Sequence, residues 1–323
     1  MLTPPSDLDE ATIAHALARW GLRSPELEYL PVGFGSHHWR AGDTFVTVDD
    51  LAAGFQAGDD EDEAFAALER AYGTASALRD GGLEFVLAPV ADDEGTSIRR
   101  LTERYAVSVT PFVDGTSTSW GAYESKDERR RVAALVGRLH VAGDDVRDLP
   151  RLDELTIPSR SVLLEALATL DVPWESGPYA EPAREALAAA ADDLHRRLAA
   201  YDEDAARVLE RTHSWVVTHG EPHRANFIVT SEGLLLVDWD TTRLAPRERD
   251  LWLVLDDELT GWDEYAAVVG DVSLDRETLA LYRRWWGLAD IAVFTADLRR
   301  PHVDSEQSAA NLKTLCENLA APA

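Results

Sequence analysis

The residues with the clearest chemical meaning lie in one stretch, where an acid and an amide five residues apart follow an apolar strand and a second acid follows the next strand. Residues 215–229 read Trp-Val-Val-Thr-His-Gly-Glu-Pro-His-Arg-Ala-Asn-Phe-Ile-Val, and residues 233–240 read Gly-Leu-Leu-Leu-Val-Asp-Trp-Asp. Phosphoryl transfer from MgATP needs a proton acceptor and oxygen ligands for the metal, all held on rigid supports. Glu221 can accept the proton of an attacking hydroxyl, and Asn226 and Asp238 can supply oxygen ligands to Mg²⁺.

Composition restricts the class of protein and its partners. The chain has 323 residues, 45% of them hydrophobic, and no apolar run of the length that a membrane helix needs. Cys316 is the single cysteine, and the N-terminus has no basic, apolar leader, so we expect a cytoplasmic protein without disulfides. The net charge of −28 opposes binding to nucleic acid or to an anionic membrane and favours a cationic small-molecule partner.

Apolar patterning predicts an α+β protein with a strand-rich first third and a mainly helical remainder. Strands are expected at 27–32, 38–40, 45–48, 97–101 and 105–112, in a five-stranded antiparallel sheet. A helix is expected over 60–79, where acidic residues at the start favour the helix dipole. Further helices are expected at 132–140, 160–170, 183–200, 203–213, 276–298 and 305–319.

The block resembles the catalytic loop of the aminoglycoside phosphotransferase and choline kinase families, His-Gly-Asp-x-x-x-x-Asn, followed by their Ile-Asp-Trp/Phe metal motif. His219, Gly220, Asn226, Asp238 and Trp239 fall on this pattern. Supporting similarities are the turn at 33–36, the hinge-like 109–115, the Leu-His pair at 139–140 and the Asp-Leu pair at 250–251, so that the resemblance covers most of 28–255.

The resemblance implies a two-lobed, protein-kinase-like fold, with an N-lobe at 1–113 and a C-lobe at 114–323. It implies an ATP-dependent O-phosphotransferase that uses Mg²⁺, with GTP as the other candidate nucleotide. The implied catalytic residues are Glu221, His219 and His223, and the implied metal ligands are Asn226, Asp238 and Asp240. The implied nucleotide-binding residues are Gly33, Gly35, Ser36, Arg40, Thr47, Phe112 and Val113.

Two positions depart from the family pattern. The family's base is aspartate, whereas Glu221 is one methylene longer, which can displace the accepting atom. The strand lysine that would contact the ATP phosphates falls at Thr47, and the chain's two lysines, Lys126 and Lys313, lie elsewhere. Candidate replacement cations are Arg40, His38 and Arg99, of which Arg40 is preferred.

Other interpretations of these motifs remain open. His219 and His223 could be a zinc pair, although Gly220 and Pro222 disfavour the helix that would align them. The turn at 33–36 could be an ordinary hairpin turn. The sequence around Asp238 to Thr242 also matches the nucleophile loop of haloacid-dehalogenase-like phosphatases, but the interval to the acidic motif at 270–275 is too short for such a domain.

A kinase-like protein that binds nucleotide and transfers phosphate only weakly is a further alternative, because of Thr47 and Glu221. For an active enzyme we expect a hydroxylated, cationic acceptor such as an aminoglycoside, another amine-containing antibiotic or an amino alcohol. Antibiotic resistance and primary metabolism are both compatible with such an acceptor. Acids after the metal motif, Asp256, Asp257, Glu258, Asp263 and Glu264, are either solvated surface or part of an acceptor site.

Overall fold

The computed structural model describes residues 3–33, 35–52 and 60–321. The chain divides into two compact units, which are described separately here. The first consists of Met1–Leu152 and Trp215–Ser273, and the second of Asp153–Ser214 and Leu274–Ala323. The predicted lobe boundary at residue 113 falls inside the first unit and stays a prediction. Within the described ranges, no helix is long and apolar enough to cross a membrane.

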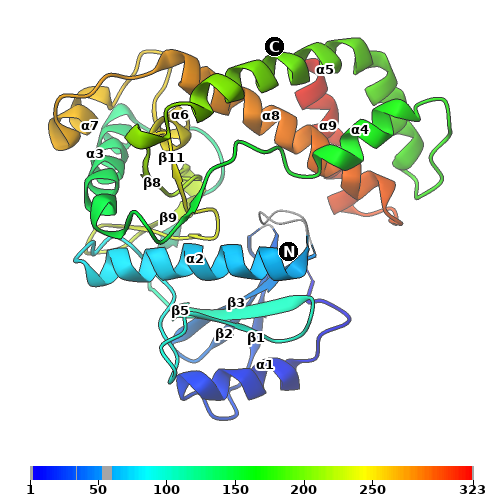
Figure 1. Ribbon diagram of the computed structural model, residues 1–323. Helices are drawn as coiled ribbons and strands as arrows, with labels where there is room; N and C mark the ends of the chain where they lie inside the picture. Colours follow the sequence, from blue (N-terminus) through cyan, green and yellow to red (C-terminus); the bar gives the residue numbers. More distant parts are fainter. Residues whose placement is uncertain (1–2, 34, 53–59, 322–323) are drawn as a thin grey trace. The chain divides into compact units, whose positions relative to one another are not determined.

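A five-stranded antiparallel sheet forms the N-terminal part of the first unit (Figure 1). Its strands are β1 (Glu28–Leu30), β2 (Ser36–Ala41), β3 (Thr44–Asp50), β4 (Ile98–Arg100) and β5 (Tyr105–Pro111). They lie in the order β1-β2-β3-β5-β4, and each neighbouring pair is antiparallel. The predicted sheet is therefore confirmed.

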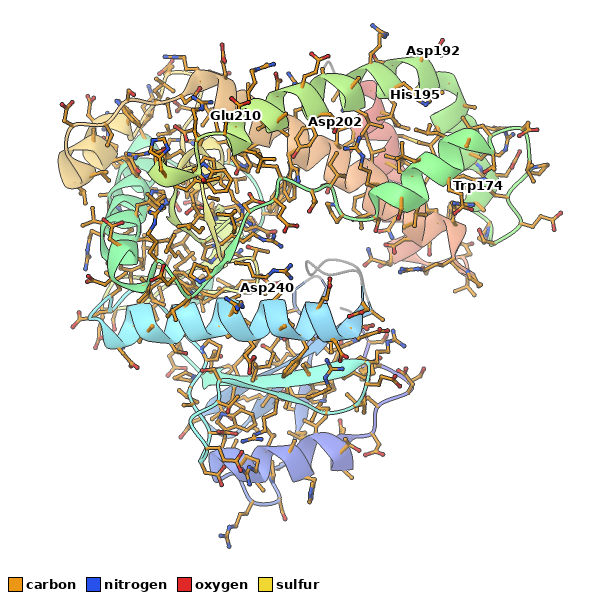
Figure 2. All side chains as sticks on the ribbon, viewed as in Figure 1. Trp174, Asp192, His195, Asp202, Glu210 and Asp240 are labelled. Atoms are coloured by element: carbon orange, nitrogen blue, oxygen red, sulfur yellow. The ribbon has the colours of Figure 1, made fainter. Side chains whose placement is uncertain are left out.

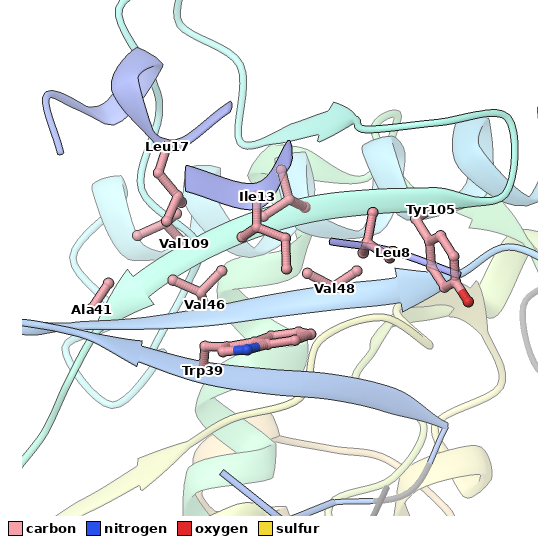
Figure 3. Packing of buried hydrophobic residues seen from close by; sticks show 10 residues of the cluster. Leu8, Ile13, Leu17, Trp39, Ala41, Val46, Val48, Tyr105 and Val109 are labelled. Carbon is pink, nitrogen blue, oxygen red and sulfur yellow. The ribbon is translucent and has the colours of Figure 1, made fainter. Parts of the chain in front are cut away.

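One face of this sheet is apolar and is covered by α1 (Glu10–Leu17), which the one-turn 3₁₀ helix Ala18–Trp20 follows. Side chains alternate between the two faces of a strand, so Val46 and Val48 of β3 point to the same side. Both are fully buried in a cluster with Trp39 of β2 and with Ile13 and Leu17 of α1. Figure 3 shows these side chains packed between the helix and the strands.

The other face of the sheet lies against α2 (Glu61–Asp80), so that the sheet is sandwiched between α1 and α2 (Figure 1). The helix begins after Asp60, whose carboxylate accepts hydrogen bonds from the N–H groups of Asp62 and Glu63. The alternation that sends Val46 and Val48 toward α1 sends Thr47 and Asp49 toward the α2 side. Asp49 there accepts a hydrogen bond from Tyr72 of α2.

The remainder of the first unit carries short strands between helices. The strands are β6 (Thr116–Ser117), β7 (Arg151–Leu152), β8 (Val216–Thr218), β9 (Phe227–Val229), β10 (Leu234–Leu236) and β11 (Arg243–Ala245). The helices are α3 (Lys126–Ala142), α6 (Glu248–Val254) and α7 (Trp262–Val269), with 3₁₀ turns at Gly143–Val146 and Arg224–Asn226. The strands form two three-stranded sheets, in the orders β10-β9-β6 and β7-β11-β8.

The second unit is helical. It contains α4 (Arg160–Ala168), α5 (Ala180–Leu209), α8 (Arg276–Arg299) and α9 (Glu306–Ala320), with a 3₁₀ turn at Thr212–Ser214. Leu194 of α5, Leu288 and Ile291 of α8 and Leu315 of α9 are almost completely buried. The predicted class, α+β with an antiparallel N-terminal sheet and a mainly helical remainder, is confirmed.

The structure corrects several predicted helices. The two helices expected at 183–200 and 203–213 are one helix, α5, because Tyr201, Ala205 and Val208 continue its buried face and the chain there has no glycine or proline. The helices α1, α6 and α7 were not predicted. Each has only seven or eight residues, so their apolar periodicity covers about two turns.

The packing of α1 can be tested with Leu17→Ala. This side chain is fully buried against the sheet, so its truncation should lower the free energy of unfolding by about 2–5 kcal/mol, measured by urea denaturation. Val32→Ala, at a valine that is 48% exposed, is the control and should cost less than about 0.5 kcal/mol. Similar small losses in both variants would contradict this account of the core.

Candidate active site

The hairpin of β9 and β10 brings the predicted amide and acid ligands together. Phe227 pairs with Leu236 in this antiparallel hairpin, so the residue before β9 and the residues after β10 lie at the same end. Accordingly, the N–H of Val237 donates to the carbonyl of Asn226 at 3.0 Å, and Asp238 follows directly. Residues separated by the length of the hairpin in the sequence are therefore neighbours in space.

The imidazole of His219 is an internal support of the catalytic loop. The ring is fully buried, and its Nε2 lies 2.9 Å from the carbonyl of Val237, which can only accept a hydrogen bond. The N–H of Glu221 donates to Nδ1 at 3.1 Å. Both contacts require the neutral tautomer with the proton on Nε2. Burial lowers the pKa of His219 to about 4, which agrees with this neutral state.

The buried carboxylate of Asp250, in α6, holds the start of the loop. It accepts hydrogen bonds from the N–H of His219 at 2.9 Å and from the N–H of Gly220 at 2.6 Å. It also accepts from Nε2 of His140 at 3.1 Å, and the hydroxyl of Tyr265 lies 2.8 Å from the other ring nitrogen. Burial alone would raise the pKa of Asp250, but the hydrogen bond with His140 and the electrostatic effect of neighbouring groups, Arg249 among them, leave the pKa lowered.

Gly220 cannot be replaced by a larger residue without rearrangement. Its φ of 101° lies in the left-handed region, and an added Cβ would collide with the guanidinium of Arg249. That guanidinium donates to the hydroxyl of Thr218 at 3.0 Å and to the carbonyl of Thr241 at 2.8 Å. Arg249 thus joins the strand before the loop to the segment after the metal motif, and glycine leaves room for it.

Asp238 and Asp240 form a carboxyl pair with strongly perturbed protonation. Part of the Asp238 side chain is exposed to solvent, but protein atoms surround it on most sides. This partial burial raises the pKa of Asp238 to about 6, and the negative charges of Glu221 and Asp49 raise it further. The pKa of Asp240 is raised further, by burial and by the charge of Asp238, with which it shares a hydrogen bond. Figure 2 shows Asp240 close to α2. Negative charge is therefore concentrated around Asp238 and Asp240.

The donor set fits a hard divalent cation, which oxygen ligands bind best. The side-chain N–H of Asn226 donates to the carbonyl of Glu221 at 3.0 Å, which leaves its Oδ1 as the oxygen to face a ligand. A cation between Asp238 and Asp240 would replace the proton that they share. In the described part of the chain, no group of three or more His, Cys, Asp or Glu side chains is arranged for a metal.

The side chains of Glu221 and His223 lie beside each other. The side chain of Glu221 is 30% exposed, and its Oε2 is 3.5 Å from Nε2 of His223. The Nδ1 atom of His223 is buried and has no hydrogen-bond partner among the described residues. The suggested zinc pair of His219 and His223 receives no support, because both ring nitrogens of His219 are used inside the loop.

The sequence analysis missed Asp49 of β3, which is only 1% exposed. Its carboxylate accepts hydrogen bonds from Ser36 at 2.7 Å and from Tyr72 at 3.1 Å, and so connects β2, β3 and α2. Burial raises its pKa to about 6, and its charge contributes to the raised pKa values of Asp238 and Asp240. A charged residue directly after the run Phe-Val-Thr-Val was the available signal.

The predicted nucleotide-binding residues of β2 and β3 lie close to one another. Gly33 has a φ of 73°, and a Cβ there would lie 2.8 Å from Nε2 of His38. The hydroxyl of Thr47 is 3.3 Å from the other ring nitrogen of His38. Burial lowers the pKa of His38 to about 3, so the ring is neutral and cannot replace the missing lysine charge. Gly35 has a φ of 92°, whereas Phe34 of this predicted turn lies outside the described residues.

The two candidate arginines are engaged with other groups. Arg40 donates to the carbonyl of Gly42 at 3.0 Å, and its guanidinium lies 4.1 Å from the centre of the Phe112 ring. Arg99 pairs with Asp92 and, at 2.6 Å, with Glu94. Arg99 is therefore paired with two acids, whereas Arg40 has its Nε donor engaged by a carbonyl.

The predicted hinge begins where β5 ends. The N–H of Phe112 donates to the carbonyl of Asp43 at 2.9 Å. Val113 makes no backbone hydrogen bond within the described ranges, so its N–H and C=O groups are available to a ligand. This arrangement suits the predicted contact with a nucleotide base.

The charge of Asp49 can be tested through the pH dependence of stability. Because its pKa rises from 3.8 to about 6 on folding, the native protein keeps a proton that the unfolded chain loses between these values. The ionised group therefore opposes folding above pH 6, by about 3 kcal/mol, and has no such effect below pH 4. Asp49→Asn should become more stable relative to the wild type between pH 4 and pH 8, as measured by urea denaturation.

Asp43→Asn, at an exposed carboxylate of the neighbouring turn, controls for the general loss of a negative charge. Parallel stability curves for the wild type and Asp49→Asn across this pH range would contradict the assigned burial of the charge.

Solved structures resemble the whole chain at low sequence identity. Spectinomycin phosphotransferase in complex with ADP and spectinomycin has a TM-score of 0.71 at 15% identity, over 97% of this chain and 95% of that chain. An aminoglycoside phosphotransferase from Alicyclobacillus acidocaldarius has a TM-score of 0.54 at 14% identity, over 98% and 93% of the two chains. The microcompartment-associated aminopropanol kinase has a TM-score of 0.55 at 15% identity, over 97% and 96%.

These likenesses confirm the predicted kinase-like fold. No curated protein matches the chain by sequence. The profile of the phosphotransferase enzyme family, however, matches residues 39–285, which include strands β3, β4 and β5 of the sheet, the catalytic loop and the metal motif. This match decides against the haloacid-dehalogenase-like alternative and confirms the prediction of a phosphotransferase. The chain belongs to the phosphotransferase enzyme family.

Proposed function

We propose that the protein transfers the γ-phosphoryl group of ATP to a hydroxyl of a small cationic molecule, with Mg²⁺ as the metal. The observation that carries this proposal is the meeting of Glu221, Asn226, Asp238 and Asp240 at one end of the β9–β10 hairpin. Phosphoryl transfer needs little covalent chemistry from the protein, so that positioned charges are sufficient.

Glu221 is the proposed general base. It is the partly exposed carboxylate of the loop, and its backbone is fixed on two sides, by the N–H bond to His219 and by the bond from Asn226 to its carbonyl. A base fixed in this way can accept the proton of the acceptor hydroxyl. His219, which is fully buried, is proposed to position the loop, and His223 to orient the Glu221 carboxylate.

Asn226, Asp238 and Asp240 are the proposed metal ligands. When bound, Mg²⁺ would supply positive charge beside the transferred phosphoryl group. The raised pKa values of Asp238 and Asp240 support this assignment, because burial and neighbouring negative charges disfavour their ionised forms, which a bound cation would stabilise.

The nucleotide is proposed to lie along the turn at Gly33, Gly35 and Ser36, with Thr47 beneath it and its base at Phe112 and Val113. The available backbone groups of Val113 support the base site, and the ADP complex of the spectinomycin phosphotransferase supports an adenine nucleotide. GTP remains the second candidate. Arg40 is the proposed cation for the phosphates, with its Nε donating to Gly42 and its guanidinium over the Phe112 ring.

The acceptor is proposed to be a hydroxylated amine. The likeness to enzymes named for spectinomycin and for aminopropanol supports this class, and the net charge of −28 favours a cation. We propose a cytoplasmic enzyme that acts on either an antibiotic or an amino alcohol of metabolism. Magnesium-dependent phosphorylation of spectinomycin, 1-amino-2-propanol and choline, followed by mass spectrometry, tests the proposal directly, and no transfer to any of them would count against it.

A second candidate function is nucleotide binding with weak transfer. The observation that favours it is the buried carboxylate of Asp49 on the same face of β3 as Thr47, where a strand cation was expected. Tight MgATP binding without ATP consumption in the presence of the same acceptors would support this candidate instead.

Glu221→Gln removes the proton acceptor and keeps the shape of the side chain. Because a positioned general base contributes about 10²–10⁴-fold, kcat should fall by this factor while the KM for ATP changes little. Steady-state kinetics with the identified acceptor will measure both. Glu232→Gln, in the exposed turn between β9 and β10, is the matched control and should leave kcat unchanged. A near-original kcat for Glu221→Gln would redirect the search for the base to Asp240.

Asp238→Asn should weaken metal binding rather than proton transfer. The activity should fall at 1 mM Mg²⁺, on the order of the free-metal level that saturates such carboxylate sites, and recover in part as Mg²⁺ is raised, because added metal offsets a lost ligand. The apparent Mg²⁺ constant from activity titrations is the measurement, and Glu221→Gln is the comparison that added Mg²⁺ should not rescue. Equal Mg²⁺ constants in Asp238→Asn and the wild type would remove Asp238 from the ligand set.

A further inference from the structure

A tryptophan outside the predicted site lies exposed beside the catalytic loop. Trp120 is 58% exposed, on the segment 118–125 that links β6 to α3. Tryptophan offers the largest aromatic face of any side chain, and exposing that face to water is unfavourable unless a ligand covers it. Its surroundings show what such a ligand would be.

The segment that carries Trp120 is fastened to the catalytic loop on both sides of this residue. The hydroxyl of Thr118 donates to the carbonyl of Arg224 at 2.5 Å. The hydroxyl of the buried Tyr123 donates to the carbonyl of Pro222 at 2.5 Å. Two side chains of one segment thus bind two backbone groups of the other, so the position of Trp120 relative to the loop is fixed.

The Trp120 ring is separated from the proposed base by a single side chain. It meets the ring of His223 edge-on, with ring centres 4.3 Å apart and planes at 70°. Nε2 of the same His223 ring is 3.5 Å from Oε2 of Glu221. A small acceptor molecule whose hydroxyl contacts Glu221 can therefore contact the Trp120 ring with another part of the same molecule.

The charges around Trp120 favour a positive ligand. Arg224 is the cation of this part of the loop, and it is already paired with two acids, Glu124 and, at 3.4 Å, Glu128. Two carboxylates thus face one guanidinium, and a third carboxylate, that of Glu221, lies at His223. An aromatic face attracts a cation through its quadrupole, and tryptophan does so most strongly.

We propose that Trp120 forms one wall of the acceptor site and binds the ammonium group of the acceptor on its indole face. The inference rests on the proposed function, since it concerns the molecule whose hydroxyl Glu221 would deprotonate. Through Trp120, segment 118–125 would make the enzyme bind amines more tightly than neutral alcohols.

The test is calorimetric titration of the full chain, saturated with MgADP, with choline, 1-amino-2-propanol and spectinomycin. Trp120→Leu keeps apolar bulk without an aromatic face, and Trp120→Phe keeps a smaller face. Trp120→Leu should raise the Kd of at least one amine roughly 2- to 30-fold, and Trp120→Phe should raise it less. The neutral isostere 3,3-dimethylbutan-1-ol should bind more weakly than choline to the wild type and equally to the wild type and Trp120→Leu.

An unchanged Kd for MgADP shows that the variants are folded. The inference is overturned if Trp120→Leu binds the amines as the wild type does, if choline and its isostere bind equally, or if none of the three amines binds saturably. Phosphate transfer separates this inference from the proposed function. Transfer with an unchanged acceptor KM in Trp120→Leu overturns the role of Trp120 alone, whereas Trp120-dependent binding without transfer in the wild type overturns the proposed function alone.

Discussion

The geometry of the site depends on one buried carboxylate, that of Asp250. It accepts the N–H groups of two consecutive loop residues, His219 and Gly220, at the point where the chain leaves β8. Two consecutive N–H groups can point to one carboxylate only if the backbone turns sharply, and the left-handed φ of Gly220 provides that turn. A buried carboxylate is stable only when its oxygens are well hydrogen-bonded, so each part of the arrangement requires the others. The lowered pKa of Asp250 indicates that these contacts stabilise its ionised form.

The contact with Asp250 also determines where the side chain of His219 lies in the loop. His219, held at its backbone by Asp250, uses its ring to join the carbonyl of Val237 to the N–H of Glu221. The metal motif and the proposed base are therefore connected through one neutral imidazole. Protonation of this ring would turn its acceptor nitrogen into a donor and break the contact with Glu221, which explains why a histidine with a lowered pKa suits the position.

The opposite electrostatic situation holds at the metal motif. Hydrogen bonds stabilise the charge of Asp250, whereas burial raises the pKa values of Asp49, Asp238 and Asp240, and the charge of Asp49 adds to the rise at Asp238 and Asp240. Clustered negative charge costs stability in the absence of a cation, and proteins retain such arrangements where function requires them. The face of β3 that meets α2 carries Asp49 instead of a cation, and Arg99 is already paired with Glu94.

The family and most of the secondary structure could be predicted from the sequence because both depend on short-range patterns. The alternation of Phe45 to Val48 determines a strand, and the spacing from Glu221 to Asn226 and on to Asp238 reports a loop between two strands. Short helices such as α6 escaped prediction because two turns contain too few residues to establish a period.

Contacts between residues far apart in the sequence were decided by the tertiary structure alone. The sequence shows that Asp250 is acidic, but only the fold brings it to the backbone of His219 and to the ring of His140. It shows Asp49 as the end of a strand, but only packing against α2 buries its charge beside Tyr72. The physical reason is that the chemical types and local conformations of residues follow from neighbours along the chain, whereas burial, pKa and hydrogen-bond partners follow from neighbours in space.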